Sequence, residues 1–167
     1  HAYLGTAVDA VHLLQSVPGK RCDQLLSAIG EDGLRVQVAL AETAEEAYGI
    51  DPKTRVTRDA EGLVISGRKS LVPYASAADG FVVTAIDGDT DSLVFVFVRG
   101  ESSGVTVLPQ DSLGLPLCDV VLDRVSIPET DLLASGPAVH AALEEWLDLT
   151  VALDAAALVA VGSEALA

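Results

Sequence analysis

The feature that most constrains the fold is a change in hydrophobic periodicity near residue 34. Beyond this point apolar residues alternate with polar ones or form short β-branched runs, a pattern typical of strands. Turn signals such as Asp87-Gly88-Asp89 and Ser103-Gly104 separate the runs. Short strands at this spacing favour a sandwich or barrel over a sheet of β-α-β units. The predicted strands span residues 34–41, 54–57, 63–65, 81–86, 93–98, 105–108 and 120–122.

Helical periodicity flanks this β-rich region on both sides. In residues 2–30 apolar side chains recur at helical spacing, and Pro18-Gly19 interrupts them, which predicts a helical hairpin. Ser135-Gly136-Pro137 opens a long helix, because proline suits the first helical turn. Apolar residues cover most of that helix, which is typical of a helix inside a larger assembly. We therefore predict an α+β chain: a helical hairpin, an antiparallel β-barrel of about seven strands, and the start of a helical bundle.

Charge and cysteine content narrow the possible partners. The chain has 25 acidic and 10 basic residues and a formal charge of −15, which repels phosphate backbones and acidic membranes. No apolar run reaches the roughly 18 residues of a membrane span. Cys22 and Cys118 are isolated and lack metal-ligand spacing. We expect a cytoplasmic protein with no metal site that binds neither nucleic acid nor membrane.

Two segments carry a more specific signal. Residues 62–85 read as a strand, a tight Ser66-Gly67 turn, a strand led by Lys69, and a third strand opened by Ala78-Asp79. Residues 113–136 include Val125-Ser126-Ile127-Pro128 before the long helix. In this order the segments resemble the β-domain of the acyl-CoA dehydrogenases.

The resemblance implies a domain organisation and a reaction. Residues 1–33 correspond to the end of an N-terminal helical domain, 34–136 to the middle β-barrel domain, and 137–167 to the first helix of a truncated C-terminal helical domain. In this family a carboxylate base removes the α-proton of an acyl-CoA thioester while a hydride passes to FAD. The base usually lies on the C-terminal helical domain, beyond this chain, so we assign no catalytic residue. Glu144 and Glu145 are expected on a solvated helix face.

The loop that contacts the flavin in this family is altered. The family places Thr-Glu-Pro-Gly-x-Gly-Ser-Asp directly after the first strand, whereas residues 41–48 read Ala-Glu-Thr-Ala-Glu-Glu-Ala-Tyr. Of that motif Glu42 alone survives, and Ala41 replaces the threonine hydroxyl. Glu45 and Glu46 would repel a pyrophosphate.

A second flavin-contacting segment is altered as well. The family's Trp-Ile-Thr is here Leu71-Val72-Pro73, and proline has no N–H to donate. We carry over Leu40 and Val72 as the cofactor-binding positions, through backbone or apolar contacts.

Three functions remain open on these residues. The first is an acyl-CoA dehydrogenase subunit that performs α,β-dehydrogenation with FAD, in a homo- or hetero-oligomer with a homologous subunit. The alternative is a non-catalytic subunit that has lost its flavin site and supports an active homologous partner. The altered 41–48 loop favours the alternative. The third is an unrelated β-barrel binding module, which the long apolar helix disfavours.

Other residues that resemble functional groups have simpler interpretations. Arg68-Lys69 is suited to steering a CoA phosphate, with a solvated hairpin face as the simpler interpretation. His12 and His140 are expected on helix surfaces, and Trp146 in core or interface packing. Residues 87–91 superficially resemble a calcium loop, but they lack its final glutamate and are predicted to form a hairpin turn.

Overall fold

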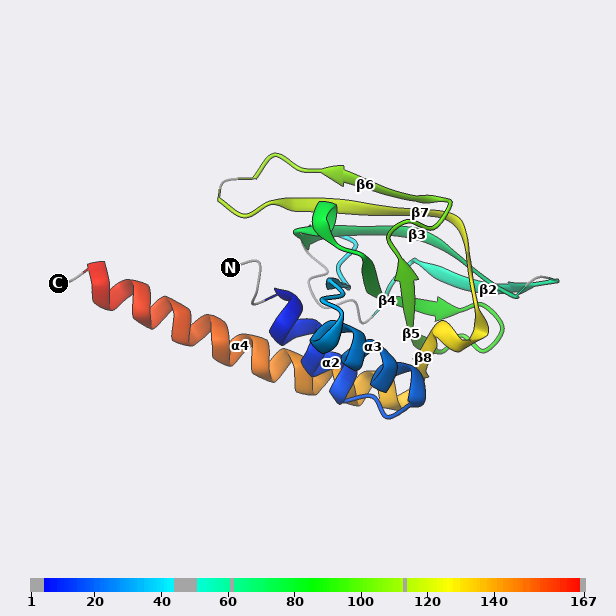
Figure 1. Cartoon of the computed structure of the whole chain (residues 1–167), viewed down its shortest axis with the longest axis horizontal. Coiled ribbons are helices and arrows are strands. Elements are labelled where there is room, and N and C mark those ends of the chain that lie inside the picture. Colours follow the sequence, from blue (N-terminus) through cyan, green and yellow to red (C-terminus); the bar gives the residue numbers. More distant parts are fainter. Residues whose placement is uncertain (1–4, 44–50, 61, 113, 166–167) are drawn as a thin grey trace.

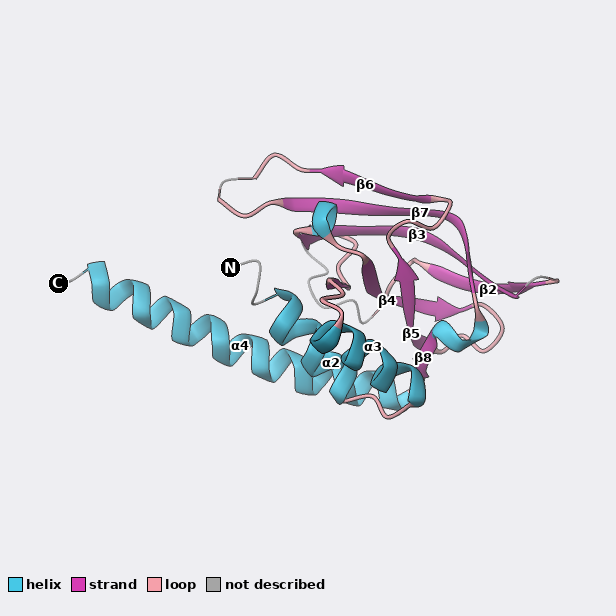
Figure 2. Cartoon of the chain, viewed as in Figure 1, coloured by secondary structure: helices cyan, strands magenta, loops and turns pink. Residues whose placement is uncertain are grey.

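The computed structural model describes residues 5–43, 51–60, 62–112 and 114–165, and it combines one sheet with a layer of helices (Figure 1). Figure 2 shows the α-helices gathered on one side of the sheet. The helical elements are η1 (Gly5–Ala10), α2 (Val11–Gln15), α3 (Lys20–Glu31), the short turns η2 (Ala75–Ala77) and η3 (Glu129–Asp131), and α4 (Pro137–Ala165). The strands are β1 (Val36–Ala39), β2 (Arg55–Asp59), β3 (Gly62–Pro73), β4 (Gly80–Asp87), β5 (Leu93–Arg99), β6 (Val105–Pro109), β7 (Leu117–Ile127) and β8 (Leu132–Ser135).

The predicted N-terminal helical hairpin is present. The π-helical segment η1 continues into α2, and the chain reverses around Pro18-Gly19 before α3 begins at Lys20. Helix α3 is amphipathic and buries Cys22 and Leu25 against the sheet side. Gly33 has a φ of 72°, which allows the chain to leave the helix and enter β1.

The sheet is open, so the prediction of a closed barrel is wrong. The strand order is β6-β7-β3-β2-β4-β5-β8, with β1 paired to β4. In the described residues β6 and β8 end this order and do not pair with each other. Edge strand β6 is mostly exposed, and β8 is short, as is common for sheet edges.

The sheet is also not wholly antiparallel, because it forks at β4. Strand β5 pairs along one edge of β4. The other edge is shared by two parallel neighbours: β1 pairs with the first half of β4, and β2 pairs with Ile86 and Asp87. Period-two patterning reveals which residues form strands but does not reveal strand direction, so this mixed topology was not predicted.

Two cores flank β4 and β5. One lies between these strands and the β2, β3 and β7 layer, and the other lies between β1, β4, β5 and the helices. Because both faces are covered, β4 and β5 are buried almost throughout. This double burial explains why their sequences are continuous apolar runs rather than alternating ones.

Two further expectations need correction. Ser66 and Gly67 do not form a turn; β3 is one continuous strand, and its register against β7 shifts between Ile65 and Gly67 as at a bulge. Residues 132–135, which were not among the predicted strands, form β8, which pairs with β5. A glycine after a polar residue fits either a turn or a bulge, and only the strand partner distinguishes them.

The long C-terminal helix α4 lies partly on the body and partly beyond it (Figure 1). Val139, Ala142 and Leu143 are buried in the helix-side core. Farther along, Leu158 and Val159 are 73% and 69% exposed. Within the described residues no helix combines the length and apolarity needed to cross a membrane.

Candidate functional site

The end of β1 and the second half of β3 form the edge to which the sequence assigned flavin contacts. The Ser70 N–H donates to the Ala41 carbonyl at 2.8 Å, which holds the two segments side by side. Between Lys69 and Val72 the register of β3 against β7 shifts. Leu71 lies in the left-handed region with φ 58° and is 42% exposed. We call residues 40–41 and 70–72 the β1–β3 edge.

This edge holds its backbone in a costly conformation. A left-handed leucine costs about 1–2 kcal/mol, and such outliers cluster at ligand sites and switch regions. At this position the strain turns the Leu71 side chain outward while Val72 returns to the core. The local geometry is consistent with a surface that contacts another molecule.

The two predicted cofactor-binding residues lie at this edge, but their side chains point into different cores. Leu40 is buried in the helix-side core and Val72 in the core between the sheet layers. The Leu40 carbonyl already accepts hydrogen bonds from Lys69 Nζ at 3.0 Å and Thr84 Oγ1 at 3.4 Å. Any contact that Leu40 or Val72 makes with a cofactor must therefore use the remaining backbone groups.

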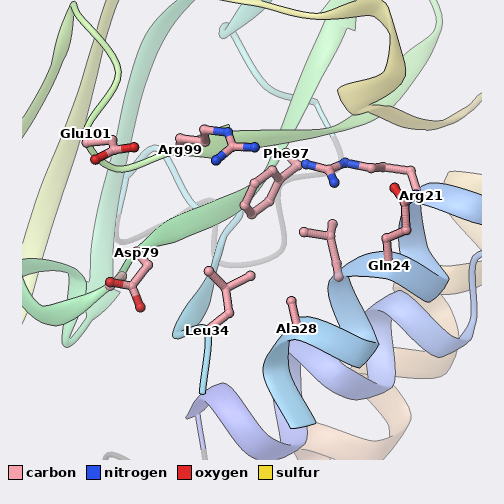
Figure 3. Close-up of a pocket in the computed structure, with 10 residues that line it drawn as sticks. Arg21, Gln24, Ala28, Leu34, Asp79, Phe97, Arg99 and Glu101 are labelled. Carbon is pink, nitrogen blue, oxygen red and sulfur yellow. The ribbon is translucent and has the colours of Figure 1, made fainter. Parts of the chain in front are cut away.

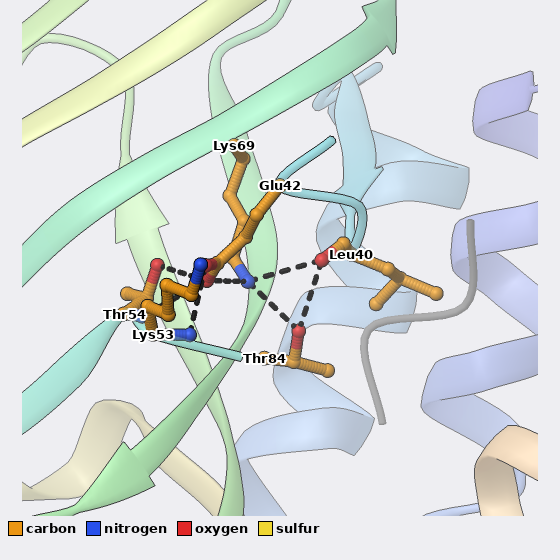
Figure 4. A network of polar contacts seen from close by, with 6 residues as sticks. All are labelled: Leu40, Glu42, Lys53, Thr54, Lys69 and Thr84. Carbon is orange, nitrogen blue, oxygen red and sulfur yellow. Dashed lines mark hydrogen bonds and ion pairs between the residues drawn. The ribbon is translucent and has the colours of Figure 1, made fainter. Parts of the chain in front are cut away.

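A buried polar network lies directly behind the edge (Figure 4). Lys69 is fully buried, and its Nζ donates to the Leu40 carbonyl, to Glu42 Oε1 at 2.9 Å and to Thr84 Oγ1 at 3.1 Å. These three acceptors match the three donors of an ammonium group. The network joins β1, β3 and β4 at the fork of the sheet.

Glu42 anchors the chain after β1 to the chain before β2. Its Oε1 accepts hydrogen bonds from the Thr54 N–H at 2.9 Å and the Thr54 hydroxyl at 2.6 Å. Its Oε2 accepts one from the Lys53 N–H at 2.8 Å. Burial raises the pKa of Glu42, but hydrogen bonds from Thr54 and Lys69, with the charge of Lys69, outweigh burial and lower it overall. Glu42 is therefore ionised at neutral pH and turned inward.

This network corrects the interpretation of Arg68-Lys69. Lys69 lies neither on a solvated hairpin face nor where it could meet a phosphate. Arg68 is more exposed, but it pairs with the buried carboxylate of Asp119. A signal for the burial of Lys69 was present, because it continues the inward row of Leu63, Ile65 and Gly67 at every second position.

Gly67 is required by the same network. A Cβ at this position would lie 2.3 Å from Thr54 Oγ1 and 2.7 Å from Thr54 Cα. The glycine lets β3 approach the Thr54 that binds Glu42. The Gly-x-Lys spacing of this chain therefore serves packing and the buried ion pair.

Two polar atoms missed by the sequence analysis are buried near α4. His12 Nε2 on α2 and Trp146 Nε1 on α4 have no hydrogen-bond partner among the described residues. His12 is half-buried, with its Nε2 turned inward, rather than fully on the surface, whereas His140 is exposed. Trp146 packs against the helix-side core, as predicted. Helical spacing alone does not reveal buried polar atoms that lack a partner.

The described residues provide few side-chain groups for a flavin. Ala41 has no hydroxyl, and Pro73 has no N–H. Glu42 is neutralised by Lys69 and faces inward, so it does not repel an anion at the edge. Glu45 and Glu46 lie outside the described residues. Glu144 and Glu145 are exposed on α4, as expected, and no group of residues suited to a metal occurs within the described ranges. The side-chain donors expected for a flavin are thus missing, and the backbone of the β1–β3 edge remains.

Comparison with solved structures matches this architecture to known enzymes. Butyryl-CoA dehydrogenase from Megasphaera elsdenii superimposes with a TM-score of 0.72 at 18% identity, covering 84% of this chain and 39% of that one. A glutaryl-CoA dehydrogenase from Mycobacterium smegmatis in complex with FADH2 gives 0.66 at 20% identity, covering 82% and 37%. The chain has the acyl-CoA dehydrogenase fold. The ChsE4–ChsE5 complex from Mycobacterium tuberculosis, which shares this fold, gives 0.67 at 22% identity, covering 84% and 37%.

Sequence comparison finds a relative of a different described activity. An L-evernosamine nitrososynthase from a Micromonospora species is 34% identical over 123 residues, which is 69% of this chain and 28% of that protein. No model of a known protein family matches the sequence. The chain thus spans less than a third of this curated relative and well under half of the three structures above.

Proposed function

We propose that the chain belongs to a flavin-dependent oxidoreductase of the acyl-CoA dehydrogenase type. It acts in α,β-dehydrogenation of an acyl-CoA thioester, with FAD as the hydride acceptor. The observation that carries the proposal is the fold match to acyl-CoA dehydrogenases, one of them in complex with FADH2. The strained, outward-facing Leu71 at the β1–β3 edge supports a contact surface there.

The part of this chain in such an enzyme is structural support around the cofactor. The β1–β3 edge offers backbone groups, and the Lys69–Glu42 pair fixes that edge from behind. When bound, FAD supplies the hydride acceptor. Leu40 and Val72 would position the cofactor through their backbones, because their side chains fill the cores.

Loss of side-chain flavin contacts supports the non-catalytic alternative. Ala41 and Pro73 lack the groups that the family resemblance requires at two separate segments. Among the structural neighbours, ChsE4–ChsE5 is a complex of two different proteins. On this alternative the chain pairs with a homologous subunit that keeps the flavin site.

The buried Cys22 and Cys118 are not joined in a disulfide, which supports a reducing compartment, and we propose a cytoplasmic location.

A second candidate reaction is oxidation of the amino group of a sugar. The observation that favours it is the 34% identity to L-evernosamine nitrososynthase, higher than the identity to the acyl-CoA dehydrogenases compared above.

The deciding experiment measures the flavin-to-polypeptide ratio of the natural full-length protein, purified with whatever copurifies. One flavin per chain, reduced anaerobically by an acyl-CoA, supports the dehydrogenase. Flavin-free protein that forms a half-occupied complex with a homologous subunit supports the structural role. Bound flavin that no acyl-CoA reduces, with turnover of an amino sugar, supports nitrogen oxidation. The proposal as a whole fails if neither the chain nor any complex that contains it holds flavin.

A matched pair of variants tests the β1–β3 edge directly. Ala41→Thr adds a hydroxyl next to the Leu40 carbonyl, whereas Ala41→Val adds similar bulk without a donor. If the edge contacts flavin, the threonine variant raises flavin occupancy and the valine variant does not. Equal occupancy in both variants would show that residue 41 is remote from the cofactor.

A further inference from the structure

A pocket of about 440 Å³ lies between helix α3 and the sheet, away from the β1–β3 edge (Figure 3). Its lining includes Leu34, which precedes β1, whereas Leu40 of the β1–β3 edge follows β1. The pocket is therefore at the opposite end of β1. Its volume lies in the range that suits small ligands.

Arg21 is held in place at one side of this pocket. Its Nε donates to Asp131 Oδ1 at 2.6 Å, and Asp131 is 2% exposed. Its guanidinium carbon lies 5.5 Å from the centre of the Phe97 ring, within cation–π range. The terminal nitrogens of Arg21 have no further partner among the described residues. Because its side chain is already ordered, a ligand that binds these nitrogens would lose little additional entropy.

Phe97 is fixed as firmly as Arg21. A Cβ on Gly80 would lie 2.5 Å from the tip of the Phe97 ring, so the ring fills the space that this glycine leaves. Phe97 is 2% exposed and belongs to the helix-side core. The ring gives the pocket a rigid floor.

Arg99 approaches the same ring from the other side. Figure 3 shows the side chains of Arg21 and Arg99 extending toward one another across Phe97. Within the described ranges Arg99 forms no ion pair or side-chain hydrogen bond. Asp131 offsets the charge of Arg21, whereas Arg99 has no counter-charge among the described residues, so an anion placed between the two guanidinium groups is attracted mainly by Arg99.

Asp131 pairs with Arg21, but the acidic residues that line the pocket form no ion pair with either arginine in the described part of the chain. Asp79 binds Arg35 through both carboxylate oxygens, at 2.9 and 2.7 Å. These bonds hold the pKa of Asp79 below its usual value. Glu101 is exposed and lies on the side of Arg99 that faces away from the ring. The space between the two arginines is thus open to an anion, although the chain carries a formal charge of −15.

We propose that this pocket binds a small molecule in which a phosphate or carboxylate group is joined to a short apolar body. The oxyanion lies between Arg21 and Arg99, whose planar donor groups match such oxygens. Gln24 lies beside Arg21, and Leu25, Ala28 and Leu34 provide an apolar wall.

Three probes on the full-length protein test this site by calorimetry and thermal shift. They are butyl phosphate, butyrate and butanol, which share an apolar chain and differ in the head group. Saturable binding of one anionic probe, with none for butanol, is expected, and the probe that binds identifies the head group. Binding should weaken with added salt. Butanol that binds as tightly as the anions would overturn the proposal. So would the absence of binding of either anion at about 10 mM, the upper range of weak metabolite sites.

A charge-matched pair of variants places the binding in this pocket. Arg99→Gln removes one guanidinium, and Arg124→Gln removes an exposed arginine on β7 that does not line the pocket. Losing a charged hydrogen-bond partner should weaken anion binding roughly tenfold in the first variant, with no change in the second. Both positions are exposed, so both variants should fold. Equal affinity of the two variants would refute the assigned site, whatever the flavin content of the protein.

Discussion

Removal of either partner of the buried Lys69–Glu42 pair should strongly destabilise the protein. Glu42→Gln leaves the buried Lys69 ammonium without a counter-charge. It also replaces one carboxylate oxygen by an amide N–H₂, which cannot accept the hydrogen bond that the Lys53 N–H donates to Oε2. Lys69→Met leaves an ionised carboxylate and removes a donor from the Leu40 carbonyl. Breaking a buried ion pair on one side costs about 3–5 kcal/mol, a large part of the stability of a typical domain.

The double variant separates the pair from the rest of the network. If the two losses were additive, Glu42→Gln with Lys69→Met would cost the sum of the single changes. Because neither charge is then left unpaired, the double variant should be about 2–3 kcal/mol more stable than that sum. Urea unfolding of all four proteins at pH 7 measures the coupling. A coupling within about 0.5 kcal/mol of zero would refute the role given to the pair.

Acidification provides a second measure of the same pair. The pKa of Glu42 is lowered in the folded protein, so its contribution is complete above the pKa of the unfolded chain and disappears as the pH falls through the folded pKa. The wild type should therefore lose more stability on acidification than the double variant does. Identical pH profiles would contradict this reasoning.

Two further substitutions, each with a control, test packing. Gly67→Ala should cost about 2–3 kcal/mol, because its Cβ would lie 2.7 Å from Thr54 Cα. Its control, Gly30→Ala in α3, meets nothing within 4 Å and should gain about 0.5–1 kcal/mol from helix propensity. Thermal unfolding compares the two variants, and equal shifts of their melting temperatures would contradict the close approach. Leu158→Gln on the projecting part of α4 should change stability by less than about 0.5 kcal/mol and reduce self-association in light scattering. Leu143→Gln, at a buried position of the same helix, should instead cost about 2–4 kcal/mol in urea unfolding.

Much of the secondary structure followed from the sequence, because periodicity reflects burial directly. The apolar runs of β4 and β5 and the 3.6-residue spacing of α3 each left a clear pattern. Strand direction and closure left none. Whether β1 and β2 run parallel to β4 depends on contacts between residues such as Val36 and Gly80, which are distant in the sequence.

The candidate site was predictable in outline and not in detail. The family resemblance located the β1–β3 edge, since Ala41 and Leu71-Val72-Pro73 could be aligned to known segments. The burial of Lys69 was not predicted, because a lysine is almost always exposed. The pocket between Arg21 and Arg99 was not predicted either, because the two arginines lie on α3 and β5 and no sequence motif links these elements.

At the fork at β4, the residues that hold β1 and β2 in the sheet are different from the residues of the connection between these two strands. Glu42 and Thr54 close the connection between β1 and β2 at its base, through bonds made before residue 44 and after residue 50. In the described part of the chain, the pairings of both strands are made by residues outside this interval. A lineage could therefore rewrite a cofactor motif in that interval while the scaffold kept its stability, so loss of chemistry and retention of architecture are compatible outcomes of the same mutations.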